Sequence, residues 1–261
     1  MPYADLGGYR MFYEEFGEGE PLVFLHGFTL DRRSWYGQAE YFKKVYRVII
    51  VDALGHGQSD APPERYGRFE RVEDFQRFVE QLNLKQFHLV GLSMGGSTAI
   101  GYALEHQERL ASLGLVATGA SGYDIGKKYQ KFDKMAKENS LESARDAWLE
   151  MTLAWFSGER AHARELLTQM IKGFSGVVWL DPMRGKYRTQ VDLEHVHKIT
   201  VPTCIIAGEL DKVFVPLAKE LHTRIAGSRL VILPKLGHLI NLEDPIEFNN
   251  HLDAFLLCLH H

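Results

Sequence analysis

The sequence predicts an α/β protein with a mostly parallel central sheet and helices on both of its faces. Two observations indicate this fold class. Short runs rich in β-branched and other apolar residues recur along the chain, and amphipathic stretches of helical length separate them. Strands that are joined through helices need crossover connections, which make them parallel. With 261 residues, the chain is long enough for one such domain, or for one domain with an insertion.

The predicted elements alternate along most of the chain. The expected strands are Tyr9–Glu14, Leu22–Leu25, Val48–Asp52, Phe87–Leu92, Leu110–Ala117, Thr203–Ala207 and Arg229–Leu233. The expected helices are Ser34–Phe42, Glu70–Leu82, Met94–Glu105, Val215–Ile225 and Pro245–Leu257. A short segment with two glycines, residues 17–20, lies between the first two strands, so we expect them to form a hairpin-like pair with an antiparallel edge.

One region interrupts this alternation. Residues 121–197 contain no convincing strand, and their amphipathic stretches are rich in Lys, Glu, Met and aromatic residues. Examples of these stretches are Lys127–Glu138, Leu141–Phe156 and Ala161–Phe174. We therefore expect residues 121–197 to form a helical cap, or lid, inserted into a core made of residues 1–120 and 198–261.

Composition and charge argue against several classes of function. The formal net charge of −4 gives no basic surface for nucleic acid or for an anionic membrane. No apolar run has the length of a bilayer span, and the N-terminus lacks the pattern of a signal peptide, so we expect a cytoplasmic protein. No Cys or His spacing predicts a metal site, and we expect no cofactor. We expect a monomer or a homodimer.

The segment from Gly91 to Gly95 predicts a catalytic nucleophile. Its pattern, Gly-Leu-Ser-Met-Gly, lies between the strand that ends at Leu92 and the helix that begins at Met94. A tight strand-to-helix turn forces a strained backbone on the central residue, and the flanking glycines remove Cβ atoms that would clash. The Ser93 hydroxyl is then held at the positive end of a helix.

A serine nucleophile needs a base and an acid that orients the base. His238 follows the strand Arg229–Leu233 after a short loop, and Asp211 follows the strand Thr203–Ala207. Both positions lie at the carboxyl ends of parallel strands, where sites of open α/β sheets collect. We predict His238 as the base and Asp211 as the acid. Glu209 is the rival acid, but we expect its side chain to point into the sheet layer.

A tetrahedral intermediate also needs backbone donors for its oxyanion. One predicted donor is the N–H of Met94, the residue after the nucleophile. The second is the N–H of Phe28, because Gly27 lets the loop after Leu22–Leu25 turn. We interpret His26, in the same loop, as a hydrogen-bonding residue that fixes the loop.

These motifs, in this order, resemble those of α/β-hydrolase-fold enzymes with a helical cap, and the likeness covers nearly the whole chain. It rests on segments 26–28, 52–59, 91–95, 208–211 and 237–245. The resemblance implies Ser93 as nucleophile, His238 as base and Asp211 as its orienting acid, with Phe28 and Met94 as oxyanion donors. It also implies a structural role for His56. Dehalogenases and epoxide hydrolases of this fold carry Asp where this chain has Ser93, which argues against both.

Aromatic residues of the cap and the entry loop suggest a mainly apolar pocket. The residues we expect to line it are Trp35, Trp148, Trp155, Trp179, Val213 and Leu239. Arg184, Lys186 and Arg188, near the end of the cap, are alternatives for binding a substrate carboxylate, although surface ion pairs suit them better.

The function that we favour is hydrolysis of carboxylic esters of small molecules through an acyl-enzyme on Ser93. Hydrolysis of a lactone, a peptide or a carbon–carbon bond is the first alternative. A lyase like the menaquinone-pathway enzyme of this fold is another, since its His-Gly-Phe-Thr opening resembles residues 26–29. A ligand receptor on the same scaffold is the alternative that is not an enzyme.

Overall fold

A computed structural model describes residues 2–124, 129–156, 161–188 and 190–259. Its central feature is an eight-stranded sheet with the strand order β1-β2-β4-β3-β5-β6-β7-β8. The strands are β1 (Tyr3–Asp5), β2 (Arg10–Phe16), β3 (Glu20–Leu25), β4 (Tyr46–Val51), β5 (Phe87–Leu92), β6 (Leu110–Val116), β7 (Thr203–Gly208) and β8 (Arg229–Leu233). From β4 to β8 all neighbours are parallel, whereas β1 and β2 are antiparallel to their neighbours. The predicted fold class is therefore confirmed.

The expected antiparallel edge of the sheet is confirmed, but the predicted hairpin between the first two long strands is wrong. β2 pairs with β4, and β3 lies between β4 and β5. Burial explains the difference, because the Leu22–Leu25 run is fully buried and suits a central strand, whereas β2 keeps a partly exposed, Glu-containing end. The intervening turn passes close to the backbone that precedes β4. A Cβ atom at Gly17 or Gly19 would lie closer than 3.0 Å to that backbone.

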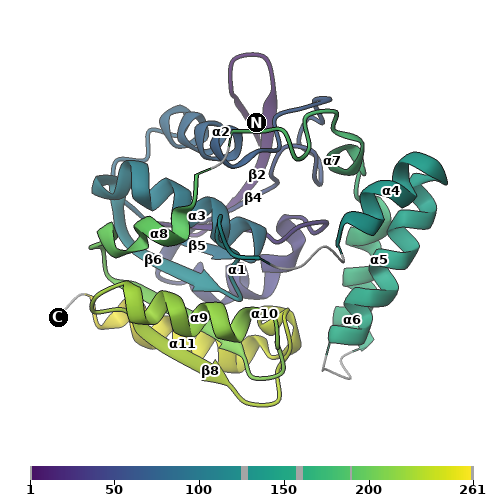
Figure 1. The fold of residues 1–261 in the computed structure, drawn as a ribbon. Coiled ribbons are helices and arrows are strands. Elements are labelled where there is room, and N and C mark those ends of the chain that lie inside the picture. The colour runs from purple at the N-terminus through teal and green to yellow at the C-terminus, as the bar shows by residue number, and fades with distance from the viewer. Residues whose placement is uncertain (1, 125–128, 157–160, 189, 260–261) are drawn as a thin grey trace.

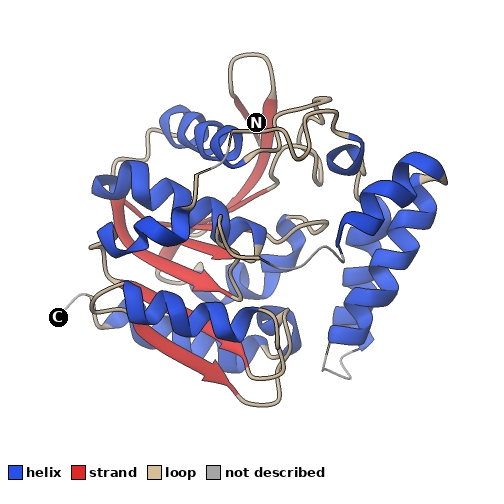
Figure 2. Cartoon of the chain, in the orientation of Figure 1, coloured by secondary structure: helices blue, strands red, loops and turns tan. Residues whose placement is uncertain are grey.

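Helices cover both faces of the sheet (Figures 1 and 2). The residues of each strand alternate between two apolar clusters, so that Leu22 and Phe24 face one side and Val23 and Leu25 the other. The first side packs against α1 (Tyr36–Phe42) and α11 (Pro245–Leu257). The second packs against α2 (Arg68–Gln81), α3 (Met94–His106) and α9 (Phe214–Arg224).

The segment between β6 and β7 is helical wherever the structure assigns regular elements to it. Its helices are α4 (Gln130–Glu138), α5 (Leu141–Trp155), α6 (Ala161–Gly173), α7 (Val177–Leu180) and α8 (Asp192–His195). Figure 1 shows α4, α5 and α6 packed side by side at one side of the molecule (teal). Residues 127–128 of the predicted helix Lys127–Glu138 lie outside the described residues. We call residues 121–197 the cap segment below.

No helix in the described ranges is both long enough and apolar enough to cross a membrane.

Candidate active site

Ser93 lies at a sharp turn between β5 and α3. Its φ of 53° and ψ of −108° are strained for a residue with a side chain. The turn is fixed by backbone hydrogen bonds, from Ser93 N to Val116 O at 2.9 Å and from Gly119 N to Ser93 O at 3.0 Å. The tertiary structure therefore holds Ser93, the predicted nucleophile, in a conformation that it would not adopt alone.

The glycines around Ser93 are required by close packing. A Cβ atom at Gly91 would come closer than 3.0 Å to the backbone of Gly95, and one at Gly95 would come equally close to the backbone of Leu25. At Gly96 it would collide with the Thr118 side chain. These contacts let α3 begin directly against β3 and β5, which brings the Ser93 turn beside the loop that follows β3.

His238 and Asp211 meet at the carboxyl ends of β8 and β7. His238 Nδ1 lies 2.6 Å from Asp211 Oδ2, and Asp211 is 7% exposed. The other carboxylate oxygen, Asp211 Oδ1, accepts from the N–H groups of Val213 at 3.2 Å and Phe214 at 3.1 Å. The Phe214 ring stacks on the imidazole, with 4.7 Å between ring centroids. Asp211 is therefore fixed in place to orient the His238 ring.

The rival acid, Glu209, does not contact His238. Contrary to our expectation, its side chain is exposed instead of pointing into the sheet layer, and its Oε2 accepts from Lys235 N at 3.0 Å. Glu209 follows β7 directly and lies before the turn that brings Asp211 to the histidine.

Ser93 and His238 line one cavity of about 510 Å³. The hydrogen bonds found among the described residues do not join them directly. Such contacts are often long in proteins without substrate. His238 Nδ1 is occupied by Asp211, so Nε2 is the ring nitrogen left to exchange a proton.

The two predicted oxyanion donors also line this cavity. Neither the Phe28 N–H nor the Met94 N–H donates to an acceptor in the described part of the chain. For Met94 the reason is general, since the first N–H groups of a helix have no intrahelical partner. The loop turns over Gly27–Leu30, closed by a hydrogen bond from Leu30 N to Gly27 O at 3.2 Å, and the positive φ of 65° falls on Thr29 and not on Gly27. The Phe28 ring packs against Trp148, Phe174 and Trp179.

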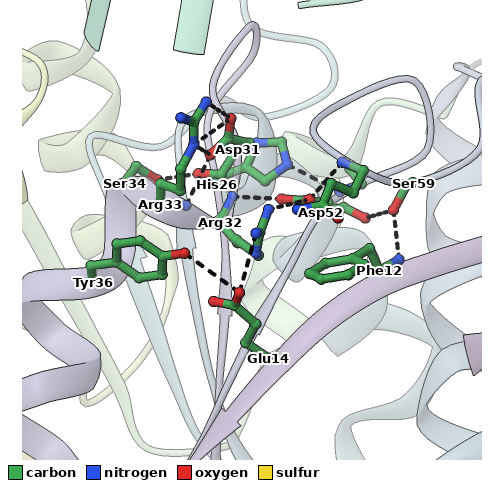
Figure 3. Close-up of polar contacts among 12 residues, drawn as sticks. Phe12, Glu14, His26, Asp31, Arg32, Arg33, Ser34, Tyr36, Asp52 and Ser59 are labelled. Carbon is green, nitrogen blue, oxygen red and sulfur yellow. Dashed lines mark hydrogen bonds and ion pairs between the residues drawn. The ribbon is translucent and has the colours of Figure 1, made fainter. Parts of the chain in front are cut away.

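His26 belongs to a framework of hydrogen bonds that fixes the loop after β3 (Figure 3). Its Nε2 accepts from Ala53 N at 3.0 Å, and its Nδ1 lies 2.8 Å from Gly27 O. Both ring nitrogens are engaged, so His26 cannot serve as the base for Ser93.

Asp52 joins the loops after β3 and β4 in the same framework (Figure 3). It accepts from Arg32 N at 2.7 Å, Arg32 Nη1 at 2.9 Å and Gln58 N at 2.8 Å. Burial raises the pKa of Asp52, although the nearby charges and these hydrogen bonds act in the opposite direction.

Three of the expected pocket residues line the cavity, and three do not. Trp148, Trp155 and Leu239 belong to the lining. Trp35 was a wrong expectation, because its ring is fully buried in the core between Phe24 and Phe248. Trp179 is fully buried behind Phe28, and Val213 lies in the turn after Asp211, so the lining includes neither.

Sequence reasoning missed the role of Glu243, although it used the surrounding motif. Glu243 is buried in the short helix α10 (Ile240–Glu243) and accepts from Gly237 N at 2.7 Å and Leu239 N at 2.9 Å. Its carboxylate therefore holds the backbone on both sides of His238. The available signal was a carboxylate five residues after the histidine, at the end of the loop that carries it.

The described ranges contain no group of three or more His, Cys, Asp or Glu side chains placed to hold a metal ion.

Comparison with known proteins shows to which family the chain belongs. A family model described as the alpha/beta hydrolase fold matches residues 20–245. The chain is 30% identical to a putative 2-succinyl-6-hydroxy-2,4-cyclohexadiene-1-carboxylate synthase of Bacillus subtilis, over 91% of this chain and 90% of that one. It is also 30% identical to a monoacylglycerol lipase of Xenopus laevis, over 99% of this chain and 82% of the lipase.

Among solved structures, an esterase from Exiguobacterium antarcticum matches with a TM-score of 0.86 and 25% identity, covering 97% of each chain. The family model spans more than half of this chain, and the relatives match nearly all of it. The chain therefore belongs to the alpha/beta hydrolase fold family.

Proposed function

We propose that the protein is a serine hydrolase that cleaves carboxylic esters of small, mainly apolar molecules through an acyl-enzyme on Ser93. The observation that carries this proposal is the cavity shared by Ser93, His238 and two unused backbone N–H groups, with Asp211 fixed behind His238. The lipase and the esterase among the similar proteins support the same reaction class.

The proposed reaction has two steps. Ser93 Oγ attacks the ester carbonyl carbon while His238 Nε2 takes the hydroxyl proton, and the oxyanion accepts from Phe28 N–H and Met94 N–H. The imidazolium then gives its proton to the leaving alcohol. Water, activated by His238, hydrolyses the acyl-enzyme and restores Ser93. In this proposal the cap segment, residues 121–197, acts as a lid and contributes Trp148 and Trp155 to the cavity wall.

Steady-state hydrolysis of short p-nitrophenyl esters tests the proposal. Ser93→Ala is expected to lower kcat/KM by several orders of magnitude and to abolish labelling by a fluorophosphonate probe. Asp211→Asn is expected to lower kcat by roughly ten-thousand-fold, whereas Glu209→Gln changes it less than threefold. Full activity of Ser93→Ala would exclude Ser93 as the nucleophile. Labelling of the wild type without turnover of any ester would favour a receptor.

A synthase-type elimination is the second candidate, favoured by the similarity to the Bacillus protein and by Arg184 and Arg188 in the cavity lining. Reaction in ¹⁸O-labelled water separates the two. Hydrolysis puts the label into the acid product, whereas an elimination leaves it in the solvent.

A further inference from the structure

Five arginines line the cavity that contains Ser93, and their charges are not balanced equally. They are Arg65, Arg68, Arg71, Arg184 and Arg188. Among the described residues, the lining includes one acidic residue, Asp74. The cavity wall therefore carries more positive than negative side chains, although the sequence suggested a mainly apolar pocket.

Three of these guanidinium groups are neutralised by carboxylates. The pairs are Arg65 with Glu73 and Asp74, Arg68 with Asp192 and Glu105, and Arg184 with Asp133. Because each of these arginines already has an acidic partner, its charge attracts an anionic ligand only weakly. Arg71 and Arg188 have no such ion pair within the described part of the protein.

Arg71 is held in position by two uncharged oxygens. Arg71 lies on α2. Its Nη1 donates to Tyr66 O at 2.7 Å, and its Nε donates to Thr98 Oγ1 at 3.2 Å. The hydrogen bonds of the described residues leave Nη2 without an acceptor. The planar guanidinium is thus fixed through two of its nitrogens, and the third is available to a ligand in the cavity.

The environment of Arg71 makes its charge costly. Burial, followed by the nearby charge of Arg68, lowers the pKa of Arg71 to about 10. The carboxylates of Glu70 and Asp192 act in the opposite direction with smaller effect, and Asp192 is bonded to Arg68. Arg71 still carries its proton at neutral pH. Arg71 is partly buried, and a partly buried cation without an ion-pair partner is stabilised when an anion binds beside it.

We propose that Arg71 forms an anion subsite in the Ser93 cavity, and that the substrate carries a carboxylate which binds there. The inference rests on the proposed hydrolase function and narrows its substrate class to esters of carboxylate-bearing molecules. Thr98, which holds Arg71, lies four residues after Met94 on α3, or about 6 Å along the helix axis. Arg71 is therefore anchored to α3 about one helical turn from Met94, one of the two proposed oxyanion donors.

Arg188 assists as a second, exposed cation at the same cavity. Its guanidinium carbon lies 4.6 Å from the centroid of the Phe69 ring. The aromatic ring is uncharged, so the positive charge of Arg188 is not neutralised by it. Lys186 is two residues away, is exposed and does not belong to the lining. It offers a matched control, because its removal changes the net charge by the same amount outside the cavity.

Two esters of equal chain length test the subsite. Mono-p-nitrophenyl suberate ends in a carboxylate, and p-nitrophenyl octanoate ends in a methyl group. The wild type is expected to show a kcat/KM at least about tenfold higher for the suberate ester, as one charge-assisted contact allows. Arg71→Met is expected to lower the suberate-to-octanoate ratio at least tenfold, mainly through KM, and Lys186→Met to leave it unchanged. An equal ratio in the wild type and in Arg71→Met would overturn the proposal.

A binding measurement separates failure of the subsite from failure of the hydrolase function. Calorimetric titration of the Ser93→Ala protein with monomethyl suberate needs no turnover, and binding is expected to weaken at least tenfold when Arg71→Met is added. Binding that depends on Arg71 without ester turnover would retain the subsite and exclude the esterase. Ester turnover that does not depend on Arg71 would retain the esterase and exclude the subsite. If Arg71→Met does not fold, Arg71→Lys replaces it as the test, because lysine keeps the charge but lacks the planar guanidinium group. Arg71→Lys is expected to raise KM severalfold for the suberate ester and to leave KM for the octanoate ester unchanged.

Discussion

Replacing Glu243 by Gln tests whether His238 is positioned through its own backbone. The two oxygens of the Glu243 carboxylate accept from the N–H groups of Gly237 and Leu239, which flank His238. Glu243 is 3% exposed, so water cannot replace a lost acceptor easily. A glutamine keeps one carbonyl oxygen and turns its NH₂ group toward the other backbone N–H.

The magnitude follows from the loss of one charged acceptor. A hydrogen bond to a charged group contributes about 1.5–3 kcal/mol, and a buried donor left without a partner adds to the cost. We expect Glu243→Gln to lower the free energy of unfolding by about 2–4 kcal/mol, or roughly 4–7 °C in Tm. Release of the loop displaces the imidazole from Ser93, and displacements of this kind lower kcat by roughly 10–100-fold.

Thermal unfolding and ester hydrolysis at 25 °C, where the variant is folded, give the two readouts. The fall in activity is expected mainly in kcat, because the displaced imidazole is the proposed base and most of the cavity lining lies on other segments. Glu209→Gln is the matched control, since Glu209 is exposed and accepts one backbone N–H, from Lys235. It is expected to change kcat and Tm little. A kcat for Glu243→Gln within twofold of the wild type would refute the positioning role, even if Tm falls.

Two further predictions concern the turn at Ser93 and His56, a buried histidine that lines the same cavity. Gly95→Ala places a Cβ atom against the Leu25 backbone, so we expect at least about a hundredfold loss of kcat/KM together with a lower Tm; wild-type kinetics would contradict the close packing. Burial lowers the pKa of His56 well below 6.5, so the folded protein keeps it neutral while the unfolded chain gains a proton below that pH. Its contribution to stability is therefore present above pH 6.5 and is lost as the pH falls, by up to about 1.4 kcal/mol per pH unit. Urea unfolding at pH 7 and pH 5 measures this loss, and an unchanged pH dependence in His56→Gln would count against it.

The sequence alone predicted what depends on local pattern. The strand Phe87–Leu92 and the helix that begins at Met94 appear where the apolar periodicity placed them, because burial on one or both faces imposes that periodicity. The glycine pattern that marks the turn between them is equally local, although Leu25 and Thr118, which require Gly95 and Gly96, lie far from them in the sequence. His238 and Asp211 were predicted to meet because carboxyl ends of parallel strands share one edge.

The tertiary structure decided which distant groups meet and which way side chains face. An apolar run shows that a strand is buried but not which neighbour it pairs with, so the partner of β2 was mispredicted. Trp35 has the residue type of a pocket wall, yet the packing of α1 and α11 puts it in the core. Arg71 resembles any arginine on a helix until the structure shows it in the cavity wall with no ion pair to another described residue. The apolar periodicity of a segment indicates which of its side chains are buried. The partners of those side chains are set by contacts between segments far apart in the chain.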